Sequence, residues 1–87
     1  MKEDFPTPTL AKIKWHCRRG MLELDLLLLP FVDQAYTQLP PSLQQSFIVL
    51  LEEPDPDIYN WFLGAQTPPP AFQAIIQSLR DYHHTAL

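Results

Sequence analysis

Ten prolines interrupt this 87-residue chain and leave room only for short elements between them. A proline is tolerated in the first turn of a helix or in a connection, but it disrupts a helix interior or a central strand. Between the prolines, apolar residues recur every three or four positions, and no window alternates strictly between apolar and polar residues. The sequence therefore predicts a single all-α domain over residues 1–87, a small bundle of about five short helices.

The apolar spacing also places these helices. They are expected near residues 10–17, 21–36, 43–51, 56–62 and 72–79, with residues 1–8 flexible and residues 81–87 frayed. Thr7 or Thr9 can cap the first helix, and Gly20 can end it. Asp55 can cap the fourth helix. The second segment is apolar on almost every side, so we expect it to be the buried central helix, kinked at Pro30.

The charges are unevenly distributed along the chain. Residues 1–20 hold five bases and two acids, a net charge of +3, whereas residues 21–87 hold one base and eight acids, a net charge of −7. An acidic chain is a poor general binder of nucleic acid, because phosphate contacts dominate that affinity. We therefore expect no nucleic-acid partner, although the basic end could bind an acidic protein surface.

Membrane insertion, export and catalysis are not expected. Apolar runs such as the four leucines at 26–29 are only a few residues long, whereas a membrane helix needs roughly 20 apolar residues. The first residues resemble neither a secretory signal nor a transit peptide, and a single cysteine fits a reducing compartment, so we expect a cytoplasmic protein. A domain of this size leaves little room for a ligand pocket of about 300–1,000 Å³, which argues against an enzyme.

No cofactor or metal site is expected either. The three histidines, His16, His83 and His84, lack the spacing of a metal site and are interpreted as surface side chains. Cys17 lies on the apolar face of the first helix and is interpreted as a small core residue. The chain has no glycine-rich phosphate loop, so we expect no bound nucleotide cofactor.

The junction between the first two helices has the composition of an interaction site. On a helical projection, Lys12, Trp15 and Arg19 share the face opposite the apolar one. A tryptophan beside cations is typical of interfaces, and Gly20 would allow a close approach to the backbone. A purely structural interpretation stays open, in which Gly20 only caps a helix and Glu23 only satisfies first-turn amides. In that interpretation Arg19 pairs with Glu23 or with the acids at 52–57.

Two stretches around this junction and beyond it resemble a known family. They are Trp-His-Cys-Arg-Arg-Gly-Met-Leu-Glu-Leu-Asp at 15–25 with Leu-Leu-Pro-Phe at 28–31, and Leu-Leu-Glu at 50–52 with Pro-Asp-Pro-Asp-Ile-Tyr-Asn-Trp at 54–61. Both are similar to the succinate dehydrogenase FAD assembly factors, in the same order and spacing. The resemblance implies a five-helix bundle without catalytic activity. It also implies that the chain promotes covalent attachment of FAD to a histidine of the flavoprotein subunit of succinate dehydrogenase. In some bacteria, members of this family do the same for fumarate reductase.

The resemblance further implies which residues bind the partner. The family's Arg-Gly-x-x-Glu motif falls on Arg19, Gly20 and Glu23. The expected partner-binding residues are Lys12, Trp15, Arg18, Arg19, Gly20, Met21 and Glu23, with Glu52, Asp55 and Asp57 as a secondary contact. We expect a monomer. The alternative function is a small helical interaction module that acts as the antitoxin of a membrane-associated toxin.

Overall fold

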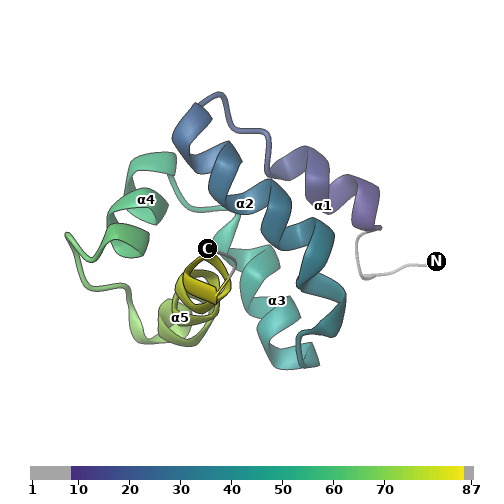
Figure 1. The fold of residues 1–87 in the computed structure, drawn as a ribbon. Helices are drawn as coiled ribbons and strands as arrows, with labels where there is room; N and C mark the ends of the chain where they lie inside the picture. The colour runs from purple at the N-terminus through teal and green to yellow at the C-terminus, as the bar shows by residue number, and fades with distance from the viewer. Residues whose placement is uncertain (1–8, 86–87) are drawn as a thin grey trace.

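The computed structural model describes residues 9–85, and these form five α-helices, one 3₁₀ turn and no strand. The elements are α1 (Leu10–His16), α2 (Leu22–Gln34), η1 (Tyr36–Gln38), α3 (Pro41–Leu50), α4 (Asp55–Leu63) and α5 (Pro70–Thr85). Figure 1 shows the helices gathered into one small bundle, which confirms the predicted fold class. The segment 1–8, which the sequence predicts to be flexible, lies outside the described residues.

Capping residues and prolines set the helix boundaries. The Lys12 N–H donates a hydrogen bond to the Thr9 hydroxyl at 3.2 Å, which makes Thr9 the N-cap of α1. Both α3 and α4 carry a proline in the first turn, and Gly64 ends α4 with a φ of 82°. The prediction that Asp55 caps α4 was wrong by one position. Pro54 is the N-cap, and Asp55 is the first helical residue, where a negative charge suits the helix dipole.

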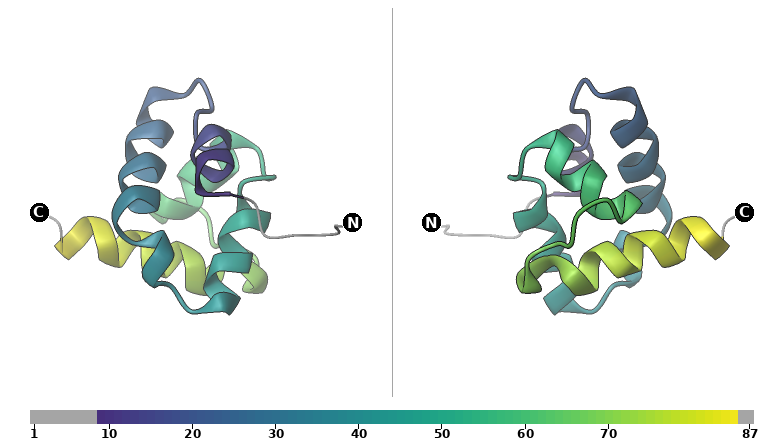
Figure 2. Two further views of the ribbon diagram at one scale, coloured as in Figure 1. Left: turned by 90° about the vertical axis from the view of Figure 1, so that its right-hand side faces the viewer. Right: turned by 90° about the vertical axis from the view of Figure 1, so that its left-hand side faces the viewer.

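The core lies where α2 meets α1, α4 and α5. From α2 it takes Leu24, Leu28, Phe31 and Val32, and from α5 it takes Phe72, Ile75, Ile76 and Leu79. The ring of Phe31 also packs against Phe47 of α3, with the ring centroids 5.4 Å apart. Figure 2 shows α5 running crosswise to α2 at the base of the bundle. Burying one such side chain contributes about 1.5–3 kcal/mol, so this shared cluster holds the helices together.

The prediction that α2 is buried on every side was wrong. Leu22 is 67% exposed and Leu26 is 62% exposed, because the neighbouring helices cover the opposite side of α2. The helix also ends earlier than predicted, at Gln34, and Tyr36 lies in the separate turn η1. Pro30 lies inside α2 without ending it.

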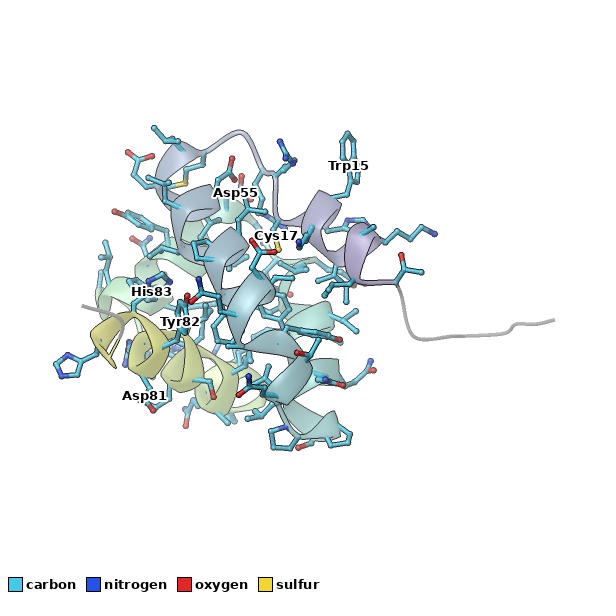
Figure 3. The ribbon with its side chains drawn as sticks, turned by 45° about the vertical axis from the view of Figure 1, so that its right-hand side comes forward. Trp15, Cys17, Asp55, Asp81, Tyr82 and His83 are labelled. Atoms are coloured by element: carbon cyan, nitrogen blue, oxygen red, sulfur yellow. The ribbon has the colours of Figure 1, made fainter. Side chains whose placement is uncertain are left out.

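The C-terminal helix continues to Thr85, past residue 81, where the sequence suggested fraying. His83 is half-buried rather than a surface side chain: its Nε2 lies 2.8 Å from the Leu27 carbonyl oxygen of α2. Its ring packs edge-on against Phe62 and Tyr82, and Figure 3 shows His83 and Tyr82 on the side of α5 that faces the bundle. His16 and His84 are exposed, as predicted. Over residues 9–85, no helix is both long and apolar enough to cross a membrane.

Candidate partner-binding site

The junction singled out in the sequence is a tight loop between α1 and α2, residues 17–21, which we call the α1–α2 loop. Its first residue, Cys17, is fully buried, and its N–H donates to the carbonyl oxygens of Ile13 and Lys14 at 3.2 and 3.0 Å. Gly20 has a φ of 82°, a backbone conformation that residues other than glycine rarely adopt. A β-carbon on Gly20 would meet no described atom within 4 Å. Glycine is therefore required by the backbone conformation, and the space beside it is open.

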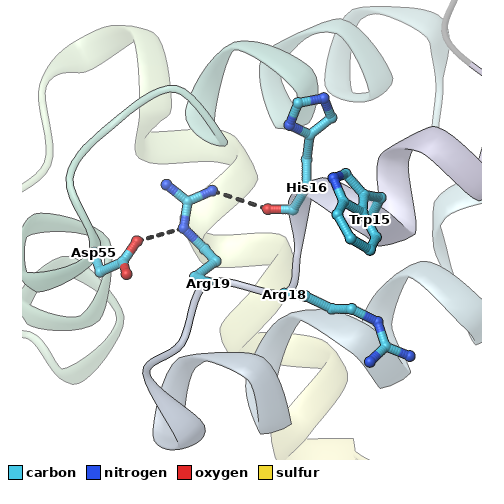
Figure 4. Close-up of a pocket in the computed structure, with 5 residues that line it drawn as sticks. All are labelled: Trp15, His16, Arg18, Arg19 and Asp55. Carbon is cyan, nitrogen blue, oxygen red and sulfur yellow. Dashed lines mark hydrogen bonds and ion pairs between the residues drawn. The ribbon is translucent and has the colours of Figure 1, made fainter.

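The Arg19 side chain turns inward from this loop and is only 13% exposed. Its Nε donates to a carboxylate oxygen of Asp55 at the start of α4. Its remaining bonds go to backbone carbonyl oxygens: Nη1 donates to His16 at 3.1 Å and to Leu51 at 2.6 Å, and Nη2 donates to Glu53 at 2.7 Å. Figure 4 shows the guanidinium directed at Asp55 and at the end of α1. The side chain thus ties the α1–α2 loop to the turn between α3 and α4.

This network decides between the two pairings that the sequence left open for Arg19. The guanidinium pairs with the acidic segment at 52–57, through Asp55, and not with Glu23. The two stretches that carry the family resemblance, 15–31 and 50–61, therefore meet in space although Arg19 and Asp55 are 36 residues apart.

Asp25 also holds the loop in place, although it was not among the residues predicted for the site. The backbone N–H of Arg19 donates to Asp25 Oδ1 at 2.8 Å, from the first turn of α2 back to the loop. An acid in the first turn of a helix that follows a tight loop was the available signal, because its carboxylate can reach free N–H groups just before the helix. The loop conformation is thus fixed through both the backbone and the side chain of Arg19.

The predicted shared face of Lys12, Trp15 and Arg19 is only partly present. α1 ends at His16, so Arg19 lies beyond the helix and its side chain does not follow the helical projection. Trp15 is 71% exposed, and Figure 3 shows its indole projecting away from the bundle. Lys12 is exposed on the same helix. The structure therefore places Lys12 and Trp15 on the surface and Arg19 largely inside it.

The two predicted partner-binding residues that follow Gly20 differ in their exposure. Met21 is the N-cap of α2 and packs partly against the core. Glu23 is exposed in the first turn of α2, and no hydrogen bond or ion pair joins its side chain to another described residue. Its carboxylate is thus available on the surface one turn beyond Gly20.

A shallow hollow of about 250 Å³ lies beside the loop, lined by Trp15, His16, Arg18, Arg19 and Asp55. Arg18 is exposed, and Figure 4 shows its guanidinium pointing past Trp15, away from Arg19 and Asp55. A second hollow of about 210 Å³ shares His16 and reaches Glu52, which is exposed. Asp57 is half-buried in the first turn of α4. Of the predicted secondary residues, Asp55 therefore lines the first hollow and Glu52 lines the second, whereas Asp57 lines neither.

The buried cysteine of the loop is not activated as a nucleophile. Burial raises the pKa of the Cys17 thiol to about 12; the Arg19 guanidinium opposes this rise and the Asp25 carboxylate adds to it. The thiol is therefore protonated at neutral pH, whereas a nucleophilic cysteine needs a thiolate. Across the described part of the chain, no group of three or more His, Cys, Asp and Glu side chains is placed to hold a metal ion.

Comparisons with known proteins agree with the resemblance. The model of the family Sdh5, described as flavinator of succinate dehydrogenase, matches residues 11–83. A protein of Aliivibrio fischeri named FAD assembly factor SdhE is 50% identical over 54 residues, which cover 62% of this chain and 63% of that protein, less than two thirds of its length. The protein of the same name from Photobacterium profundum is 37% identical over 78 residues, covering 88% of this chain and 89% of the relative.

A solved structure shares the fold. The solution structure of a UPF0350 protein matches with a TM-score of 0.72 at 36% sequence identity, covering 87% of this chain and 82% of the other. The family model spans nearly the whole bundle, from α1 to α5. The chain therefore belongs to the Sdh5 family, the flavinators of succinate dehydrogenase.

Proposed function

We propose that this chain is a non-enzymatic assembly factor that acts as a cytoplasmic monomer. It binds the flavoprotein subunit of succinate dehydrogenase and promotes covalent attachment of FAD to that subunit. The family match and the names of the relatives support the flavinylation role. The observation that carries the binding role is the α1–α2 loop, where Gly20 has open space beside it and the loop backbone is held rigidly from two sides.

The shape of this surface supports a role in binding a protein rather than FAD. The two hollows, of about 250 and 210 Å³, are small, whereas ligand pockets usually enclose about 300–1,000 Å³. Trp15 and Arg18 are exposed at the loop, and both residue types are frequent among the residues that dominate binding energy at interfaces.

Binding alone can promote a reaction whose reacting groups both belong to the partner. The histidine and the flavin that become joined lie on the flavoprotein subunit, so this chain has no group to contribute to the bond. It raises the population of the reactive conformer only by binding that conformer more tightly than the others. A pre-formed loop suits this task, because little conformational freedom is lost when a rigid surface binds.

The direct test is deletion of the gene followed by gel electrophoresis of the denatured flavoprotein, with covalent flavin read by fluorescence. We expect the fluorescence of the succinate dehydrogenase subunit to fall on deletion and to return when the chain is supplied again. The fumarate reductase subunit is read in the same gel, and a loss in its band would make it a second client. Unchanged flavin in the deletion strain would refute the proposal, and copurification with a membrane protein would then favour the antitoxin alternative.

A further inference from the structure

Four basic residues lie in the described part of the basic N-terminal segment, and two of them are already paired within the chain. Lys14 pairs with Asp33 of α2, and Arg19 pairs with Asp55 of α4. Lys12 and Arg18 are exposed and make no ion pair with any residue between 9 and 85. The positive charge that this surface offers to another molecule therefore comes from Lys12 and Arg18.

The guanidinium of Arg19 has little capacity left for a second molecule. A guanidinium has five N–H donors, and four hydrogen bonds within the chain use Nε, both hydrogens of Nη1 and one of Nη2. A forked pair of bonds to a partner carboxylate would require breaking at least one of these bonds. Breaking them would also release the turn between α3 and α4 from the α1–α2 loop.

Arg18, the neighbouring residue, has the opposite environment. It lines the hollow beside Trp15, and its guanidinium points away from the Arg19 network (Figure 4). The exposed indole of Trp15 forms an apolar wall beside this charge. A planar guanidinium binds a carboxylate through two parallel hydrogen bonds, and a neighbouring apolar wall reduces competition from water.

We propose that the two adjacent arginines have different roles, an inference that rests on the proposed function. Arg19 is a positioning residue: with Asp55 it fixes the α1–α2 loop and does not itself bind the partner. Arg18 is the binding residue, and its ligand is an acidic side chain of the partner protein that enters the hollow beside Trp15. Asp55 is a positioning residue as well, because its carboxylate holds the Arg19 side chain in place.

The chain offers a matched control for the loss of a structural arginine. Arg80 also donates to carbonyl oxygens at a helix end, through Nε to Phe62 at 3.0 Å and through Nη2 to Trp61. It lies on α5 and takes no part in the Arg19 network. A glutamine at position 80 therefore removes hydrogen bonds to a helix end of the same kind as those lost at position 19, away from the α1–α2 loop.

The experiment measures the melting temperature of Arg18→Gln, Arg19→Gln and Arg80→Gln, and their affinity for the purified flavoprotein subunit at low and high salt. We expect Arg18→Gln to melt like the wild type and to bind about tenfold more weakly, with a reduced dependence on salt. We expect Arg19→Gln and Arg80→Gln to melt lower. Of these two, only Arg19→Gln binds more weakly, and its dependence on salt stays that of the wild type because Arg18 is still present.

A double-mutant cycle separates contact from positioning. Asp55 acts in this account only by holding Arg19. The double variant Arg19→Gln with Asp55→Asn should therefore have the same melting temperature and affinity as Arg19→Gln alone. Arg18→Gln combined with Asp55→Asn gives additive losses of affinity. The proposal is overturned if Arg18→Gln binds like the wild type, or if Arg19→Gln loses affinity while its melting temperature stays unchanged.

Failure of the proposed function would be recognised separately. If the wild-type chain does not bind the flavoprotein subunit, the proposed function and the role of Arg18 toward it are both refuted. The melting temperatures still test the positioning role of Arg19, because additive losses in Arg19→Gln with Asp55→Asn would refute it.

Discussion

The buried thiol of Cys17 predicts that the folded chain loses stability in alkaline solution. Burial raises the pKa of this thiol from 9.0 to about 12. Above pH 9 the unfolded chain releases the proton while the folded chain keeps it, so the free energy of unfolding falls as the pH rises toward 12. The contribution of this group is fully present below pH 9.

The size of the effect follows from the pKa difference. One pKa unit corresponds to about 1.36 kcal/mol, so raising the pH from 8 to 10.5 removes about 2 kcal/mol of stability through Cys17, because only the interval above pH 9.0 contributes strongly. Small domains have a total stability of about 5–15 kcal/mol, so this loss is measurable by urea unfolding at pH 8 and at pH 10.5 under reducing conditions.

The control for this measurement is Cys17→Ala, because other groups also titrate in alkaline solution. Burial raises the pKa of Tyr36 as well, and its contribution is common to both proteins. The alanine variant starts from a lower stability at pH 8, since a small cavity replaces the sulfur. We expect it to lose about 2 kcal/mol less than the wild type between pH 8 and pH 10.5. If the two proteins lost the same stability between pH 8 and pH 10.5, burial would not raise the pKa of the Cys17 thiol, and this prediction would be refuted.

Two further predictions concern the core. The Tyr36 hydroxyl is buried without a hydrogen-bond partner in the described structure, so Tyr36→Phe should leave the stability unchanged or raise it by about 1 kcal/mol in urea unfolding, and a clear loss would reveal a hidden partner. Leu28→Ala should cost about 3–5 kcal/mol because Leu28 is fully buried, whereas Leu26→Ala, at a 62% exposed position of the same helix, should cost less than about 1 kcal/mol. Equal costs at the two leucines would contradict the observed packing of α2.

Much of the fold was accessible from the sequence because local rules decided it. The prolines and the apolar spacing predicted five helices, and Thr9 and Gly64 behave as the capping rules predict. The exposed side of α2 could not be predicted in this way. Leu22 and Leu26 are as apolar as their buried neighbours, and which of them is covered depends on where the other helices pack.

The loop that holds the candidate site was predicted from the sequence, but its internal contacts were not. Gly20 and its neighbours form the exposed loop as expected, because a glycine that ends a helix leaves a local signal. The direction of the Arg19 side chain depends on Asp55 and on carbonyl groups of a turn more than 30 residues away. A helical projection of the first helix contains no information about that turn, so it placed Arg19 on the wrong face.

The central claim is that the partner docks at the open space beside Gly20, and the second glycine of the chain provides the control. Gly20 and Gly64 both have a φ of 82°, and a β-carbon at Gly64 would lie 3.7 Å from its nearest neighbour, an ordinary contact. Glutamine at either position therefore meets a similar backbone strain, about 1–2 kcal/mol, and only position 20 faces the proposed partner.

The most direct measurement is the covalent flavin on the succinate dehydrogenase flavoprotein in a deletion strain that carries Gly20→Gln or Gly64→Gln at matched protein levels. Our account predicts that Gly64→Gln restores flavin fluorescence to the wild-type level and that Gly20→Gln leaves it near the level of the deletion strain. Equal restoration by the two variants would contradict the claim that the α1–α2 loop is the surface that binds the partner.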